Sequence, residues 1–297
     1  MSPLAIVLVL SSGFLHAVWN SWAKESEEKL EFILSMQGFI VVLLAPAVIY
    51  LGLNGARLGF RAPLFWYLTF ISGVVHFFYS YFLANAYRYG DISVAYPVSR
   101  GFSPFLVALF SYLLLGETPS ALGATGISLI AIGLIVMSKD KGEDGENRET
   151  GFGGIKKTIQ FALLTGVAIA AYTLVDGRAV RSFNPISFSL GFFFVSSLLL
   201  SLAILNKERK GDKKNPFANI SDGFPHFLWA GGISSLSYLL ALYAMRLSQL
   251  AYIASFRNVS ILFALLLGGV RLKEAVSASR ILGALTLFAG VFLISMG

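Results

Sequence analysis

Long, continuous apolar runs separated by short polar turns fill this chain from one end to the other. Each run approaches the about 20 residues that a helix needs to cross the hydrocarbon core of a bilayer. Because the runs are continuous and do not alternate, they indicate helices rather than the strands of an outer-membrane barrel. The pattern predicts an all-α integral membrane protein with ten transmembrane helices, at residues 3–22, 32–51, 63–87, 92–117, 121–138, 158–180, 186–205, 224–245, 250–270 and 278–295.

One polar segment divides these spans into two sets of five. Residues 139–157 (KDKGEDGENRETGFGGIKK) are charged and rich in glycine, a composition typical of a linker. We therefore expect a first five-helix repeat at 1–138, a charged linker at 139–157 and a second five-helix repeat at 158–297. A second polar loop, 206–223, lies within the later half.

The two halves repeat each other around an arginine placed deep in an apolar helix. Arg257 and Glu274 follow Arg100 and Glu117 by 157 residues each. A repeat with an odd number of spans must insert its second copy upside down. Inverted repeats of this kind are a hallmark of secondary transporters, whose substrate site lies at the repeat interface near the membrane midplane.

Glycines recur at the same offset. Gly126 and Gly133 correspond to Gly283 and Gly290, and a spacing of seven residues places both glycines of a half on one helix face. Small residues on a face let helices approach closely in lipid. We expect these glycines to contact neighbouring helices and not the substrate cavity.

Composition narrows the class further. Hydrophobic residues make up 56% and charged residues 13% of the chain, against about 25% charged residues in soluble domains. The chain has no cysteine, which excludes disulfides, Fe–S clusters and thiol catalysis. Its net charge of +7 sits mainly in loops, where it is a topology signal, and no patch suggests nucleic-acid binding. No metalloprotease, hydrolase, nucleotide-binding or dinucleotide-binding motif is present, so we expect no enzyme, no cofactor and no metal.

The chain resembles the EamA-type branch of the drug/metabolite transporter superfamily over nearly its whole length. The resemblance rests on the ten spans in two halves, on the proline-containing fourth span that closes on Leu115-Gly116-Glu117, and on the echo Leu272-Lys273-Glu274. It implies a helical basket with a central cavity that moves small metabolites or drugs. Small four-span relatives couple protons through a glutamate in the first span. This chain has none there, so that route is not expected, and other proton or ion coupling stays open.

These observations predict a secondary transporter or facilitator of small organic metabolites, anionic or zwitterionic, that works by alternating access in the plasma or inner membrane. Its partners would be the small-molecule substrate and the lipid bilayer, and it would act as a monomer or weak homo-oligomer. The alternative is a non-transporting membrane protein, either an intramembrane enzyme or a scaffold. Two span histidines are too few for a metal site, and a scaffold needs no arginines in the hydrocarbon. Loop charges favour termini outside the cell, whereas the family pattern favours termini inside.

Arg100 and Arg257 are the main candidates for substrate binding. A cation near the bilayer centre costs a few kcal/mol or more, so each should face a cavity or a partner. A guanidinium matches carboxylate, phosphate or phosphonate. The alternative is that each arginine pairs with a protein carboxylate or caps carbonyls at a helix break. Pro97 and Pro104 bracket Arg100 and remove backbone donors, which frees carbonyls and favours an interrupted helix at the site.

Other polar and aromatic side chains complete the expected site, because polar residues in spans usually face the protein interior. The expected substrate-binding residues are Arg100, Arg257, Tyr96, Asn258, His16, Trp19, Asn20, His76, Tyr79 and Tyr238. Asp176 lies near the end of its span, which favours a side chain reaching the membrane interface over pairing with an arginine or proton uptake. For Glu117 and Glu274 we prefer a role at helix N-termini over gating through arginines of the opposite half.

Overall fold

The computed structural model describes residues 1–25, 29–89, 92–138, 152–209, 220–260, 262–263 and 278–296, and within these ranges the chain is helical with no strand. The helices follow the predicted spans with ends that differ by a few residues. They are α1 (Pro3–Glu25), α2 (Lys29–Leu53), α3 (Pro63–Tyr89), α4 (Ile92–Leu115), α5 (Ala121–Ser138), α6 (Phe152–Ser182), α7 (Pro185–Arg209), α8 (Ile220–Leu247), α9 (Leu250–Phe256), the 3₁₀ turn η1 (Arg257–Val259) and α11 (Ala278–Met296).

The structure differs from the predicted linker at one boundary and describes only part of the predicted ninth span. The helix α6 begins at Phe152, inside the segment that we expected to be a linker. The remainder of that segment, 139–151, lies outside the described residues, as do Glu274 and the polar loop from 210 to 219. The expected ninth span is described only up to Ser260 and again at 262–263.

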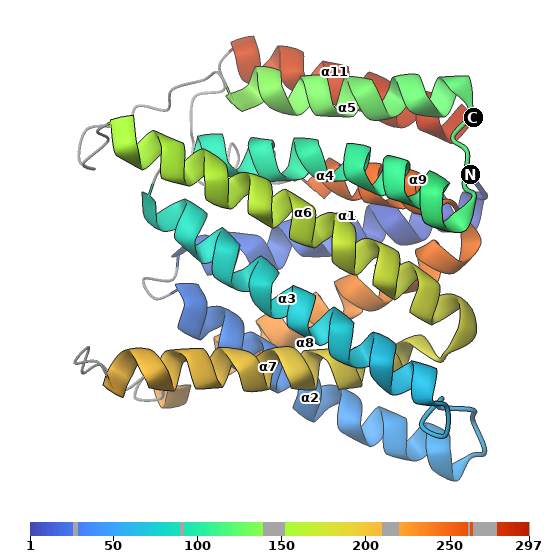
Figure 1. The fold of residues 1–297 in the computed structure, drawn as a ribbon, viewed down its shortest axis with the longest axis vertical. Coiled ribbons are helices and arrows are strands. Elements are labelled where there is room, and N and C mark those ends of the chain that lie inside the picture. Colours follow the sequence, from blue (N-terminus) through green and yellow to red (C-terminus); the bar gives the residue numbers. More distant parts are fainter. Residues whose placement is uncertain are drawn as a thin grey trace.

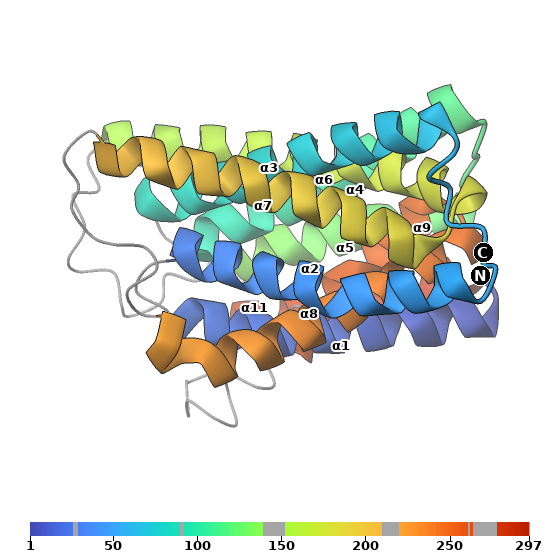
Figure 2. The same cartoon turned by 90° about the horizontal axis from the view of Figure 1, so that it is seen from below.

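The helices lie side by side in a bundle, and both termini are at the same end of it (Figure 1 and Figure 2). The most extensive packing joins helices from different halves of the chain: α5 with α11, α3 with α6, α1 with α8, α4 with α6, α3 with α7 and α2 with α7. Neither half could be removed without exposing the packed face of the other, so the two halves form one interleaved body.

The outer surface is apolar, as a bilayer requires. Six helical stretches are long and apolar enough to cross a membrane within the described ranges, and shorter apolar stretches lie in α1, α5 and α11. Large apolar side chains such as Val42, Trp66, Leu114 and Phe288 are more than half exposed. Exposed apolar area on this scale would favour aggregation in water but is well solvated by lipid. The protein is a multi-pass membrane protein.

The helices α5 and α11 approach each other through glycines. A Cβ atom added at Gly126 would lie 2.6 Å from the carbonyl oxygen of Gly290, and one added at Gly133 would lie 2.6 Å from that of Gly283. The earlier glycine of α5 meets the later glycine of α11, and the later glycine of α5 meets the earlier one, so α5 and α11 are antiparallel. The expectation that these glycines contact neighbouring helices is confirmed, and the antiparallel arrangement places Gly126 against Gly290 and Gly133 against Gly283.

This contact predicts a clear stability difference between two glycine variants. Gly126→Ala should lower the midpoint of thermal unfolding, because the added methyl group meets backbone and overpacking costs about 1–3 kcal/mol. The matched control is Gly232→Ala on α8, where a Cβ atom meets nothing within 4 Å. This control should be neutral or stabilising, since alanine favours a helix over glycine by about 0.5–1 kcal/mol. Equal midpoints for the two variants, measured in one detergent, would contradict the packing.

Candidate functional site

The buried centre of the molecule is a helix break at Arg257. The α-helix that begins at Leu250 ends at Phe256, and Arg257 starts the 3₁₀ turn η1. A 3₁₀ turn inside a span often marks a hinge or a site under strain. The sequence favoured an interruption in the first repeat, at Pro97 and Pro104, but α4 is helical through both prolines. The break lies in the second repeat, which carries no proline at that place.

The guanidinium of Arg257 is buried, and none of the described residues gives it a direct polar partner. The residue is 6% exposed, and its guanidinium carbon lies 5.2 Å from the centre of the Tyr238 ring. Within the described part of the chain, Arg181 forms an ion pair with Glu117, and His76 lies 3.9 Å from Asp176, a contact that is charged only if His76 is protonated. The Arg257 side chain makes no hydrogen bond to the described residues. A cation–π contact engages the face of the guanidinium and leaves its N–H donors available.

Arg100 is also buried and contacts a histidine of α1. Its Nη2 atom lies 2.7 Å from Nε2 of His16. A guanidinium nitrogen can only donate, so Nε2 accepts and His16 is a neutral imidazole with its proton on Nδ1. The ring of Trp19 packs edge-on against His16, with 4.9 Å between ring centroids. This part of the predicted site is assembled by α1 and α4.

Pro104 explains how the two arginine segments are joined. A residue at this position would normally donate its N–H to the carbonyl of Arg100, four residues earlier, but proline has no N–H. The free carbonyl accepts a hydrogen bond from Nδ2 of Asn258, at 3.2 Å, and lies 3.3 Å from the hydroxyl of Ser103. The proline therefore creates the acceptor that links α4 of one half to η1 of the other.

Glycines let two further helices come close to these segments. A Cβ atom at Gly13 on α1 would lie 3.4 Å from the backbone nitrogen of Ser260, and one at Gly166 on α6 would lie 2.9 Å from the carbonyl of Ser99. The first helix of each half thus packs against the arginine segment of the other half. Near the break, the buried hydroxyls of Ser12, Ser255 and Ser260 have no hydrogen-bond partner among the described residues.

A second polar cluster surrounds the hydroxyl of Tyr238. The Ser72 hydroxyl donates to Oδ1 of Asp176 over 2.5 Å, and the Tyr238 hydroxyl is hydrogen-bonded to Oδ2. Nε2 of His76 lies 3.1 Å from the Tyr238 hydroxyl. Asp176 is fully buried, so the expectation that it reaches the membrane interface is wrong. Its partners come from α3 and α8, which the sequence of α6 alone cannot indicate.

The predicted site residues therefore fall into two groups around Arg257. His16, Trp19, Arg100 and Asn258 lie on one side, and His76 and Tyr238 lie on the other. Tyr79 contacts the second group through Tyr172, with 5.7 Å between ring centroids. Tyr96 and Asn20 belong to α4 and α1, but their side chains are outside what the structure describes. Sequence analysis missed Ser72 and Tyr172 and undervalued Asp176.

Glu117, which follows α4, contacts α6 and α9 at the end of the bundle that carries both termini. Its Oε1 atom pairs with Arg181 at the end of α6, and its Oε2 atom accepts from the backbone nitrogen of Leu250 over 2.8 Å, at the start of α9. Nearby, the Tyr252 hydroxyl accepts from the backbone nitrogen of Ser120. Glu117 therefore supports the start of α9 and pairs with an arginine, both in the opposite half, and not the N-terminus of the next helix, α5, where the preferred role placed it.

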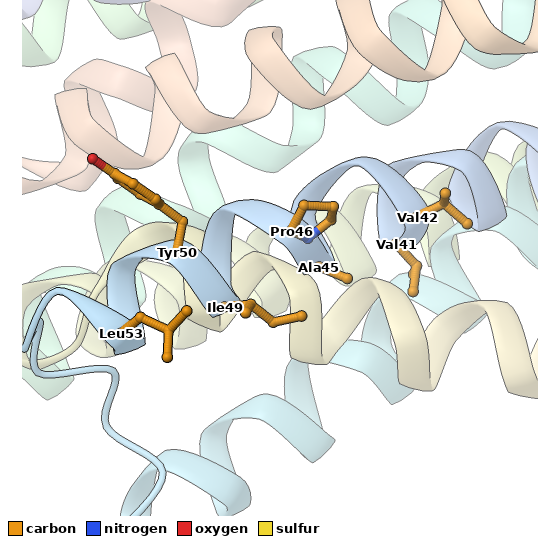
Figure 3. A pocket seen from close by; sticks show the side chains of 7 residues that line it. All are labelled: Val41, Val42, Ala45, Pro46, Ile49, Tyr50 and Leu53. Atoms are coloured by element: carbon orange, nitrogen blue, oxygen red, sulfur yellow. The ribbon is translucent and has the colours of Figure 1, made fainter.

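A shallow groove on the outside of the bundle is not part of this site. It has a volume of about 590 Å³ and is lined by residues of α2 from Val41 to Leu53, whose side chains follow one side of that helix around Pro46 (Figure 3). The lining is almost entirely apolar and lies on an exposed surface. None of the predicted site residues contributes to it.

Comparison with known proteins gives three findings. The family described as "EamA-like transporter family" matches residues 3–139 and 156–296. "Multidrug resistance protein EbrB" of Bacillus atrophaeus is 34% identical over 82 residues, which are 27% of this chain and 70% of that protein. EbrB of Bacillus subtilis (strain 168) is 33% identical over the same shares. A solved crystal structure matches with a TM-score of 0.74 at 16% identity, covering 100% of this chain and 98% of its own, which supports the fold alone.

The link between Pro104 and Asn258 can be tested by a double-mutant cycle. Asn258→Ala should destabilise the protein by about 1 kcal/mol, the usual net cost of a lost hydrogen bond. Pro104→Ala supplies an N–H that can occupy the Arg100 carbonyl, so the same loss should be smaller in that background. Thermal unfolding of the four proteins gives the interaction energy. An identical cost of Asn258→Ala in both backgrounds would show that the carbonyl is not what Asn258 supports.

Proposed function

Because the chain belongs to the EamA-like transporter family, whose members are small-molecule transporters of the drug/metabolite transporter superfamily, we propose that it carries small organic anions or zwitterions across the cell membrane. Transport would proceed by alternating access, with residues 1–138 and 158–297 as two inverted repeats joined by the segment between them. An intramembrane enzyme or a scaffold is the weaker alternative, since the family and the EbrB relatives point to a transporter.

One observation carries the proposal on substrate charge. Arg257 keeps a full positive charge in the protein interior while its N–H donors have no acceptor within the described residues. Such a cation is costly unless an anion joins it. A carboxylate or phosphonate could accept two parallel hydrogen bonds from the guanidinium, and the free hydroxyls of Ser255 and Ser260 lie in the same segment. The rings of Tyr238 and Trp19 would contact apolar parts of the substrate.

The inverted-repeat arrangement is supported by the packing. The helices α5 and α11, which are the last helices of the two halves, pack antiparallel through the glycines of both, and α1 on α8 has its equivalent in α6 on α3. Each arginine segment is covered by the first helix of the other half. A relative rocking of the halves would therefore change the surroundings of both arginines together, as alternating access requires.

The proposal that the substrate is an anion is tested by comparing a carboxylic acid with its amide. Phenylacetate and phenylacetamide have nearly the same shape and differ in charge. We expect the acid to stabilise the purified protein against heat and the amide to do so less, since a ligand that binds the native state raises its apparent stability. Arg257→Gln should weaken acid binding roughly tenfold to a hundredfold, as a charge-assisted hydrogen bond contributes about 1.5–3 kcal/mol.

Two further variants complete this test. Arg257→Lys keeps the charge without the planar fork and should give an intermediate loss. Arg246→Gln removes an equal charge from an exposed position at the end of α8 and should change nothing. A second pair, methylphosphonate with its neutral diester, extends the comparison to another anion type. Equal effects of Arg257→Gln on the acids and on their neutral partners would contradict the proposal.

Alternating access predicts that Glu117 keeps the interior closed at the end that carries the termini. The chain has no cysteine, so a single Ser255→Cys reports access beside Arg257. Glu117→Ala removes the contacts to Arg181 and Leu250 and should speed labelling of Cys at 255 by a membrane-impermeant maleimide about fivefold or more, the lower range of typical coupling energies.

The matched control for this labelling is Ser196→Cys, a buried position on α7. It should remain slow with and without Glu117→Ala. Faster labelling at both positions would indicate general loosening, and unchanged labelling at 255 would mean that Glu117 does not hold the interior closed.

A further inference from the structure

The polar groups of Ser72, His76, Asp176 and the Tyr238 hydroxyl have no role in the substrate contacts proposed above, which use only the ring of Tyr238. All four residues are buried. They come from three helices, with Ser72 and His76 on α3, Asp176 on α6 and Tyr238 on α8. A set of polar groups brought together in this way from distant parts of the chain is expensive to bury unless its hydrogen bonds are satisfied.

The hydrogen bonds of the cluster restrict where its hydrogens can lie. Nδ1 of His76 lies 2.9 Å from the backbone carbonyl of Ser72. A carbonyl oxygen can only accept, so Nδ1 carries a hydrogen. The hydroxyl of Ser72 donates to Oδ1 of Asp176, which leaves Oδ2 as the atom that faces the rest of the cluster.

The bridging hydroxyl of Tyr238 has one hydrogen but two contacts. It meets both Oδ2 of Asp176 and Nε2 of His76, the latter at 3.1 Å. It can donate across only one of these contacts, so the other needs a hydrogen from His76 Nε2 or from the Asp176 carboxyl group. In either arrangement the cluster holds one proton more than a neutral histidine with an ionised aspartate. A buried ion pair costs more than neutral partners, which favours the proton on Asp176.

We propose that Asp176, with Ser72, His76 and Tyr238, forms a proton-binding site of this transporter. On release, the O–H bond of the Asp176 carboxyl group breaks, the proton leaves, and a carboxylate remains that accepts from Ser72 and Tyr238. The contact between Tyr238 and Nε2 of His76 then has no hydrogen. On uptake, the same steps run in reverse.

Arg257 connects this site to the proposed substrate site. Its guanidinium lies over the ring of Tyr238 and acts electrostatically on Asp176, His76 and His16. The charge left on Asp176 after proton release is attracted to Arg257, as a bound anion would be. Proton and anion should therefore favour each other's binding, and this linkage is reciprocal. The coupling to an anion rests on the proposed function, whereas the proton site itself does not.

The charged and titratable groups around the site define what can influence it. The helix α7 contributes the rings of Phe192 and Phe193, which stack on or tilt against His76 and carry no charge. Among the described residues, the other charged or titratable side chains near the cluster are Tyr79 of α3, Tyr172 of α6 and Arg257 of η1.

Proton binding can be measured without any transported solute. Purified protein in lipid nanodiscs is titrated between about pH 5 and pH 9, a range above the titration of ordinary carboxyl groups, and released protons are counted with an indicator dye. The wild type should release one proton more per molecule than Asp176→Asn. In infrared difference spectra, the protonated carboxyl band of the wild type should be absent from Asp176→Asn. Tyr172→Phe is the matched control, because its hydroxyl is not part of the chain of contacts, and it should behave as wild type.

A second variant, Arg257→Gln, leaves all four residues of the cluster unchanged. A nearby cation favours the ionised carboxylate, so Arg257→Gln should shift the extra titration to higher pH. Equal proton release by the wild type and Asp176→Asn would overturn the proton site, whether or not phenylacetate binds. An unshifted titration in Arg257→Gln would overturn the link through Arg257. Because neither readout uses a substrate, a failure here is distinct from a failure of the acid–amide test.

Discussion

The cost of a cation inside an apolar protein is the constraint around which this molecule is built. Arg257 retains its charge in almost any surroundings, so its N–H donors must be given partners or kept for a ligand. In the described structure the guanidinium faces the ring of Tyr238 and has no acidic partner. The 3₁₀ turn at Arg257 and the glycine of α1 against it bring α1 close to this group, and the buried hydroxyls of Ser255 and Ser260 beside it have no partner among the described residues.

The two arginines of the repeat have different surroundings. Arg100 donates to a neutral His16, and its carbonyl, released by Pro104, accepts from Asn258 beside Arg257. The two segments are therefore linked through backbone and side chain across the boundary between the halves. In this arrangement the Arg100 side chain contacts His16, and under the proposed function Arg257 is the arginine that would receive a ligand. Asp176 lies across Tyr238 from that charge.

Much of the fold was predictable because lipid imposes long apolar spans, and the family resemblance read from the proline-containing fourth span is confirmed. The burial of both arginines and the glycine contacts of α5 and α11 also followed from spacing alone. The rest depends on partners distant in sequence. The carboxyl group of Asp176 is hydrogen-bonded to Ser72 and Tyr238, which are 104 and 62 residues away. No local pattern in α6 indicates these partners. The break at Arg257 has no proline to mark it.

The central claim is that the guanidinium of Arg257 is the group that receives the anionic part of a substrate. The most direct measurement is nuclear magnetic resonance of the protein with isotope-labelled arginine side chains, assigned by comparison with Arg257→Lys. Addition of phenylacetate should shift the Arg257 side-chain N–H resonances in a saturable way, and phenylacetamide should leave them in place. Saturable binding of the acid with the Arg257 resonances unmoved, and those of another arginine shifted instead, would contradict the account.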